Sequence, residues 1–447
     1  MIITADHILP VSDKPIKNGA VVVNGDLIEA VGELSQIAER YPGEEIIDLG
    51  NCAVLPGFVN CHSHLEITAM RGALDSVEQD FRSWLLKLNS FRAMLSDEEI
   101  RISADAGAIE AARSGVTCMG DIGRFGRAGF EALKAVGLRG ILFQETEFSP
   151  DDRTALDDIA ELWKKMADLQ ADSTELVEIG ISPHSPYTVS RKLFEKIAEL
   201  VKDQGIKVSI HAAESRTEDE LLKNGQGFFI DVYKKFDVEW NSPRVSPIEF
   251  LHSTGILETS PLLVHCVTVS DEDISMIAKS GSSIAHCPRS NAKFGHGFAP
   301  LEKFISAGID VGFGSDSVAS NNTCDIIEEA RFAAFAARNI SSDGKFITAE
   351  NVLEIATLGG AKALGLDEKI GTIESGKHAD LTAVSLSNIA QQPISDIVAA
   401  IVFSSNARDV VMTMVDGKII YRDGKCLTTD EAETINKLAD IAEKFKA

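Results

Sequence analysis

Six of the ten histidines lie at or just beyond the ends of short apolar segments that are predicted to be strands. They are His62, His64, His184, His211, His265 and His286. His62 and His64 are one residue apart, and alternate residues of a strand point the same way, so both imidazoles can bind one cation. A nitrogen from His211 and an oxygen from Asp316 would complete an N₃O site with room for water. The pattern predicts one divalent metal ion per chain.

The elements that must position these side chains alternate between strand and helix. Helix-period segments such as DEDISMIAKSG separate most of the apolar segments. Eight strands alternating with helices predict an α/β fold, a (β/α)₈ TIM barrel over residues 54–365, with catalytic groups at the C-terminal ends of the strands. The eight segments are AVLPGFVNCH, GVTCMGD, LRGILFQE, VEIGISPH, KVSIHAAE, LLVHC, SSIAHC and DVGFGSD.

The two ends of the chain are predicted to be β-rich. Residues 1–53 and 366–447 are expected to meet in one small β-sandwich domain, followed by a C-terminal helix over residues 428–446. Hairpin turns with positive φ favour Asn-Gly and Asp-Gly pairs. Such pairs separate apolar runs at Asn24-Gly25, Asp416-Gly417 and Asp423-Gly424.

Composition excludes several classes of protein. A formal net charge of −25 argues against nucleic acid and anionic membranes as partners, because a polyanion would be repelled. Seven scattered cysteines show no disulfide framework and no CxxC pair, so we expect a reducing cytoplasm. No apolar run reaches the length of a transmembrane helix, and the first residues lack the pattern of a signal peptide.

Several motifs occur in an order that resembles a known family. PGFVNCHSHLE, SIHAAES, LVHCVTVS, IAHCPRSN and GFGSDSVASNN resemble the successive barrel motifs of the amidohydrolase superfamily, in its branch of deaminases and chlorohydrolases. That branch includes methylthioadenosine/S-adenosylhomocysteine deaminases, guanine deaminases and triazine chlorohydrolases. GTIESGKHADLTAVSL resembles the segment that returns from the barrel to the family's sandwich. The resemblance spans nearly the whole chain.

The resemblance implies a role for each matching residue. His62, His64, His211 and Asp316 match the ligands of a single metal ion, for which zinc is the first expectation and iron or manganese are alternatives. Glu214 matches the proton shuttle. A homodimer is also expected from the family.

Two further histidines and Asp316 match residues of the reaction itself. His265 and Asp316 match the groups that orient the attacking water, and His184 matches a contact to the substrate heterocycle. A divalent ion lowers the pKa of bound water towards about 7, which makes hydroxide available at neutral pH. Glu214 would carry the water's proton to a ring nitrogen and to the departing ammonia.

Four more residues are candidate substrate contacts: Glu66, Trp84, Glu145 and Ser320. Glu66 could receive a sugar hydroxyl or a ring N–H, or cap the following turn. Ser320 could contact substrate or order its own loop, and His286 could line the pocket or hold a neighbouring group. The remaining histidines are interpreted as surface or structural residues: His7, His252, His296 and His378.

The predicted function is hydrolytic deamination of an amino-substituted aromatic heterocycle, in particular a small adenosine-type nucleoside. Arg82-Ser83 precede Trp84-Leu85 where a ribose-binding glutamate is expected, and Gln144-Glu145 stand where an arginine is expected for a homocysteine carboxylate. Both departures weaken an S-adenosylhomocysteine assignment. The HLE motif, the Phe/Trp-rich first loop and the acidic third strand resemble those of aminodeoxyfutalosine deaminases, so aminodeoxyfutalosine is ranked first, ahead of methylthioadenosine and S-adenosylhomocysteine. The alternatives are a triazine-type chlorohydrolase, a guanine or cytosine deaminase, a binuclear amidase and a non-catalytic scaffold on the same fold.

Overall fold

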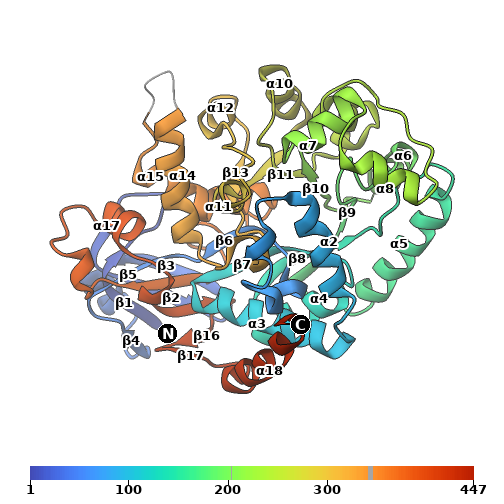
Figure 1. Ribbon diagram of the computed structural model, residues 1–447. Coiled ribbons are helices and arrows are strands. Elements are labelled where there is room, and N and C mark those ends of the chain that lie inside the picture. The colour runs from blue at the N-terminus through green and yellow to red at the C-terminus, as the bar shows by residue number, and fades with distance from the viewer. Residues whose placement is uncertain (203, 341–345, 447) are drawn as a thin grey trace.

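The computed structural model describes residues 1–202, 204–340 and 346–446. Figure 1 shows the parallel strands of the middle of the chain surrounded by helices, with strands from both chain ends gathered at one side. Within the described residues, no helix is both long and apolar enough to cross a membrane.

Eight parallel strands form two four-stranded sheets, which confirms the predicted α/β class and the eight predicted strand segments. The first sheet contains β6 (Phe58–Ser63), β7 (Val116–Gly123), β8 (Arg139–Glu145) and β9 (Val177–Ser182). The second contains β10 (Ser209–Ala212), β11 (Leu262–His265), β12 (Ser283–His286) and β13 (Val311–Phe313). A parallel bridge between Ile181 and Val208 links the two sheets. The Asp316 N–H also donates to the His62 carbonyl at 3.0 Å.

Helices follow most of these strands and bury their apolar faces against them, and further helices (α1, α17 and α18) belong to the segments before and after the parallel strands. Those of the first half are α1 (Leu34–Arg40), α2 (Phe81–Arg92), α3 (Asp97–Arg113), α4 (Arg127–Val136), α5 (Ala155–Gln170), α6 (Arg191–Lys202), α7 (Arg216–Asp219) and α8 (Phe228–Lys235). Those of the second half are α9 (Pro247–Ser253), α10 (Asp271–Ser280), α11 (Pro288–Lys293), α12 (Leu301–Ser306), α13 (Val318–Asn321), α14 (Ile326–Ile340), α15 (Ala349–Glu354), α16 (Gly360–Ala363), α17 (Ile397–Ser404) and α18 (Glu431–Glu443).

The ends of these helices follow local sequence rules. Helix α10 begins with a capping box between Ser270 and Asp273 and ends at Gly281, whose φ of 70° suits a residue without Cβ. The predicted DEDISMIAKSG helix is therefore confirmed.

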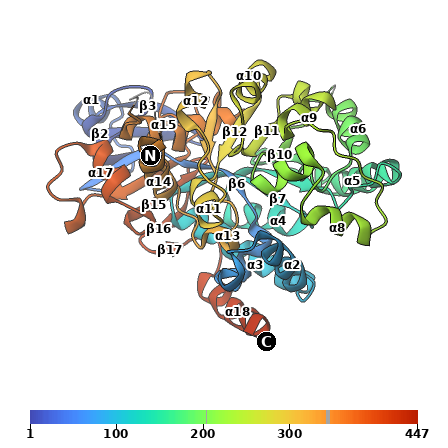
Figure 2. The same cartoon turned by 45° about the horizontal axis from the view of Figure 1, so that its top comes forward.

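Strands from both ends of the chain form one nine-stranded sheet. Its N-terminal members are β1 (Ile2–Ile8), β2 (Ile16–Asn24), β3 (Leu27–Glu33), β4 (Ile46–Asp48) and β5 (Cys52–Pro56). Its C-terminal members are β14 (Leu381–Ser385), β15 (Val410–Val415), β16 (Lys418–Arg422) and β17 (Lys425–Cys426). β5 joins the two groups, since it pairs with β1 on one side and β14 on the other. In Figure 2 these strands lie together, and α18 extends away from them.

The turns of this sheet agree with prediction at two of three places. Asp416-Gly417 and Asp423-Gly424 are the two-residue loops of hairpins, and all four residues have positive φ. The first hairpin is shifted by one residue, because Asn24 pairs with Leu27 and leaves Gly25-Asp26 as the loop. Only Gly25 of that loop has positive φ, so the predicted Asn24-Gly25 turn is wrong by one position.

Candidate active site

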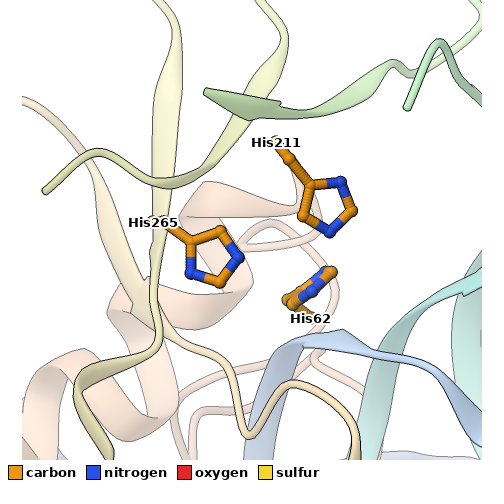
Figure 3. A group of neighbouring side chains, drawn as sticks. All are labelled: His62, His211 and His265. Atoms are coloured by element: carbon orange, nitrogen blue, oxygen red, sulfur yellow. The ribbon is translucent and has the colours of Figure 1, made fainter. Parts of the chain in front are cut away.

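The predicted metal ligands meet at the carboxyl ends of the parallel strands. His62 lies within β6 and His211 within β10, while His64 and Asp316 follow β6 and β13. His62 Nε2 is 3.4 Å from Asp316 Oδ1, and His64 Nε2 is 3.7 Å from the same oxygen. Figure 3 shows the rings of His62 and His211 turned towards a shared space, with His265 beside them. Two overlapping groups of these side chains have atoms close enough to hold one ion.

The acceptor nitrogens of His64 and His211 face each other. His64 Nδ1 lies 3.1 Å from the Ile122 carbonyl oxygen, and His211 Nδ1 lies 3.0 Å from that of His184. A carbonyl can only accept, so both Nδ1 atoms carry the proton and both Nε2 atoms carry a lone pair. The Nε2 atoms are 3.3 Å apart. Two nitrogens bound about 2.0–2.1 Å from one tetrahedral ion would be about 3.3 Å apart, so the residues present fit a metal ion.

The third imidazole supports the same conclusion. His62 is fully buried, and neither of its ring nitrogens has a hydrogen-bond partner among the described residues. A buried polar atom without a partner costs free energy. Gly314 allows this close packing, because a Cβ there would lie 2.7 Å from His62 Cβ. A cation bound by Nε2 would give one of these two atoms a partner.

Two serine hydroxyls orient the carboxylate of Asp316. Ser290 and Ser320 donate hydroxyl hydrogen bonds to its Oδ2 at 2.6 and 2.9 Å, which leaves Oδ1 towards the histidines. Asp316 has a φ of 55° and His265 a φ of 75°, values that are strained for residues with Cβ. Such strain concentrates at functional sites.

Glu214 lies beside this cluster, directly after β10. Its Oε2 accepts a hydrogen bond from the Tyr187 hydroxyl at 3.1 Å, and its Oε1 is 3.7 Å from His265 Nε2. His265 Nδ1 lies 2.9 Å from Asn291 Oδ1, which fixes the imidazole with its Nε2 towards Glu214. A carboxylate and an imidazole in contact can pass a proton between solvent-derived water and a substrate.

Burial governs the charges here. It lowers the pKa of His64 and His184 to about 3, and that of His211 well below its ordinary value. These imidazoles are therefore neutral at physiological pH, as metal ligands must be. Burial alone would raise the pKa of Asp316, but the neighbouring histidines hold it well below the usual range. Burial raises the pKa of Glu214, and Asp316 adds to this effect.

A cavity of about 600 Å³ opens over these groups, a size usual for small-molecule sites. Its wall brings together predicted residues: His184, Trp84 and Glu145, together with His64, His211, Glu214, His265 and Asp316. Much of the remaining wall is aromatic: Phe81, Phe148, Phe228, Phe229, Phe236 and Phe294. Burial raises the pKa of Glu145 to about 7. The cavity therefore offers an apolar surface with a few polar groups near the cluster.

Three other predicted residues do not line this cavity. Both oxygens of Glu66 accept backbone N–H groups, from Phe125 at 3.1 Å and Gly126 at 2.7 Å, as a turn cap does. Ser320 contacts Asp316 as described above, and His286 is buried against Phe313. Their predicted roles in substrate contact stay predictions.

Sequence reasoning missed several residues of the site. Arg92 of α2 and Arg124 line the cavity, and Tyr187 contacts Glu214. His296 was interpreted as a surface or structural residue, yet its side chain is only 8% exposed and its Nε2 is 3.7 Å from Glu214 Oε1. Arg124 directly follows β7, so the strand-end pattern that identified the histidines could have indicated it as well. Arg92 lies on a helix and His296 in a loop after a helix, where spacing carried no signal. The SPHSPYT motif, which holds Tyr187 near His184, is the one hint the sequence offers.

Comparison with known proteins finds relatives over the full length of the chain. A methylthioadenosine/S-adenosylhomocysteine deaminase from Thermodesulfovibrio yellowstonii is 31% identical, over 100% of this chain and 98% of the relative. A 5′-deoxyadenosine deaminase from Methanobrevibacter smithii is 32% identical, over 98% and 96% of the two chains.

Solved structures show the same likeness. The crystal structure of an adenosine deaminase from Xanthomonas campestris with bound zinc superposes with a TM-score of 0.89 at 26% identity, covering 100% of this chain and 98% of that one. The sequence model of the amidohydrolase family matches residues 53–420. The chain therefore belongs to the amidohydrolase family.

Proposed function

We propose that this protein is a metal-dependent hydrolytic deaminase of an adenosine-type nucleoside. The observation that carries the proposal is the pair of opposed Nε2 acceptors of His64 and His211, next to Glu214 and at the base of an aromatic cavity. The relatives named as nucleoside deaminases support the same reaction class.

The metal would be held by His62, His64, His211 and Asp316. Zinc is the first expectation, because a similar structure contains it, with iron or manganese as alternatives. When bound, a divalent ion supplies a water molecule acidic enough to act as a nucleophile at neutral pH.

The chain's own residues would complete the reaction. His265 Nε2 and Asp316 Oδ1 both offer acceptor lone pairs beside the cluster and would orient the attacking water by accepting its hydrogen bonds. Glu214 would take a proton from that water and deliver it to a ring nitrogen of the substrate, then to the departing amine. Tyr187 holds Oε2 of Glu214, so Oε1, which has two lone pairs, is left to carry the proton on one of them.

The substrate would place its purine near Glu214 and His184 and its ribose and 5′ group along the aromatic wall. The cavity volume is sufficient for a nucleoside with a 5′ substituent. We retain aminodeoxyfutalosine as the first candidate, with methylthioadenosine, S-adenosylhomocysteine and 5′-deoxyadenosine beside it.

The proposal also covers the closure of the barrel, the composition of the second domain, the oligomeric state and the location in the cell. We propose that β6 to β13 close into one (β/α)₈ barrel over residues 54–365, and that 1–53 and 366–447 form a composite β-sandwich domain. Support for closure comes from the Ile181–Val208 bridge and the bond from Asp316 to His62. A homodimer and a cytoplasmic location complete the proposal.

The test is release of ammonia from a panel of adenosine nucleosides, guanine, cytosine and a chlorinated triazine, with chloride measured in parallel. We expect ammonia from at least one adenosine nucleoside and a kcat lower by about 10²–10⁴-fold in Glu214→Gln. Glu199→Gln, on the exposed face of α6, is the matched control. Chloride release without ammonia, or full turnover in Glu214→Gln, would overturn the proposal.

A further inference from the structure

His296 lies in the loop after α11, outside the groups that the proposed reaction uses. Its ring is stacked on Phe294 with centroids 5.2 Å apart and meets the edge of Phe81 at 5.1 Å. Its Nε2 is buried and has no hydrogen-bond partner in the part of the chain that the structure describes. That atom points at Glu214 Oε1, 3.7 Å away. A buried polar atom directed at a carboxylate calls for an explanation.

The other contacts of Glu214 show what His296 can add. Tyr187 donates to Oε2, so that oxygen already has a donor. His265 also lies 3.7 Å from Oε1, but its Nδ1 is paired with Asn291 Oδ1. Neutral His265 therefore presents an acceptor, and cannot donate, to Oε1. Within the described parts of the chain, Oε1 accepts no hydrogen bond and His296 Nε2 donates none.

We propose that His296 is a positioning residue, which donates its Nε2–H to Glu214 Oε1 and, with Tyr187, holds the carboxylate in the orientation that proton transfer requires. The inference rests on the proposed deaminase function. The distance of 3.7 Å must shorten by several tenths of an ångström, and hydrogen bonds of catalytic groups commonly tighten once substrate is bound. The ring contacts with Phe81 and Phe294 restrain the imidazole in the required plane.

Packing alone is the competing explanation, because the ring also fills a space between two aromatic side chains. Two substitutions separate the explanations. His296→Phe keeps an aromatic ring and removes the donor, whereas His296→Gln removes the ring and keeps an amide N–H near the position of Nε2. His252→Phe changes an exposed histidine on α9 and is the control.

The first measurement is steady-state kinetics with whichever adenosine nucleoside the wild-type, metal-loaded enzyme deaminates. We expect His296→Phe to lower kcat by about 10–100-fold, the range known for groups that orient metal ligands, with KM unchanged. His296→Gln should recover most of the loss. Metal content should equal that of the wild type in both variants. Equal losses in the two variants, or none in His296→Phe, would overturn the inference.

The pH profile gives a second readout that packing would not change. Removing a donor from the carboxylate raises the pKa of Glu214, so the acid limb of kcat/KM should move to higher pH in His296→Phe and return in His296→Gln. The other titratable groups around Glu214 remain the same in these variants: His62 on β6, His265 on β11, Tyr187 after β9, Glu218 on α7 and Asp316 after β13.

Crystal structures of the two variants give a readout that does not depend on activity. The carboxylate of Glu214 should rotate away from its present position in His296→Phe and keep it in His296→Gln. If His296→Phe does not fold, His296→Asn, whose shorter amide cannot reach Oε1, replaces it. A wild type inactive on every nucleoside would refute the proposed function, while an unmoved Glu214 in the donor-free variant would refute the role of His296.

Discussion

The amino ends and the carboxyl ends of the parallel strands differ in how their polar side chains are paired. Arg139, the first residue of β8, lies at the amino end. Arg139 is 3% exposed and binds Asp380 through Nε at 2.8 Å and Nη2 at 3.2 Å. It also pairs with Asp416, whose N–H donates to Asp380 at 2.9 Å. Each charge of this cluster has a partner from the other side of the interface with the nine-stranded sheet.

At the carboxyl ends of the parallel strands, several histidine nitrogens lack hydrogen-bond partners among the described residues. In the part of the chain that the structure describes, the two ring nitrogens of His62 form no hydrogen bond, and the Nε2 acceptors of His64 and His211 face each other. Both ends contain histidine and aspartate, since His378 Nδ1 lies 2.7 Å from Asp416 Oδ1 in the first cluster. There, however, Arg139 is already the cation. The difference indicates that the first cluster stabilises the fold, and it supports the proposal that the second cluster binds a metal ion.

The largest effect should come from removing one histidine of each cluster. His211→Ala should lose both the bound metal and measurable deaminase activity, because it removes a ligand. His378→Ala should keep both, since Arg139 still balances Asp416. Metal analysis and ammonia release measure the two effects. Loss of metal in His378→Ala alone would reverse our assignment of the clusters.

Arg139→Met should be the most destabilising of the changes in the cluster of Arg139, Asp380 and Asp416. It leaves Asp380 buried without its cation, and breaking a buried pair in this way costs about 3–5 kcal/mol. Denaturant unfolding measures this loss, while kcat of the folded enzyme should not change. Arg139→Met combined with Asp380→Asn should recover part of the stability. A loss under about 1 kcal/mol would mean that the pair contributes no more than an exposed one.

Glu145→Gln should change how stability depends on pH. The pKa of Glu145 is raised from 4.5 to about 7 by burial, so the folded state binds its proton more tightly than the unfolded state. Its contribution is fully present below pH 4.5 and is lost as pH rises through about 7. Relative to Glu145→Gln, the wild type should lose up to about 3 kcal/mol between pH 4.5 and 8. If the free energies of unfolding of the wild type and of Glu145→Gln changed equally with pH across this range, the burial of a neutral carboxyl at Glu145 would be contradicted.

Arg101→Ala should have the smallest effect. Arg101 and Asp105 form a partly exposed pair on one face of α3, with 2.8 Å between Nε and Oδ1. Exposed pairs of this spacing contribute about 0.3–0.5 kcal/mol. Denaturant unfolding should show a change of that order, far below that of Arg139→Met. A comparable loss in the two variants would remove the distinction between buried and exposed charge pairs.

The strands could be predicted from the sequence, as could the proximity of His62, His64 and Asp316, because both depend on local patterns. Apolar runs ending in histidine mark β6, β10 and β11, and parallel strands bring their ends together whatever the loops do. The register of the first hairpin was missed by one residue, since Asn24 and Asp26 suit such a turn equally. Arg92 and His296 reach the site from a helix and a loop, and only tertiary packing decides where those lie.

The most direct test of the account is metal analysis of the purified protein together with a crystal structure that locates the ion by anomalous scattering. We predict one divalent ion per chain, bound by His62, His64, His211 and Asp316, with His265 and Glu214 beside it. A protein that binds no ion at these four side chains when supplied with zinc, iron or manganese would contradict the central claim.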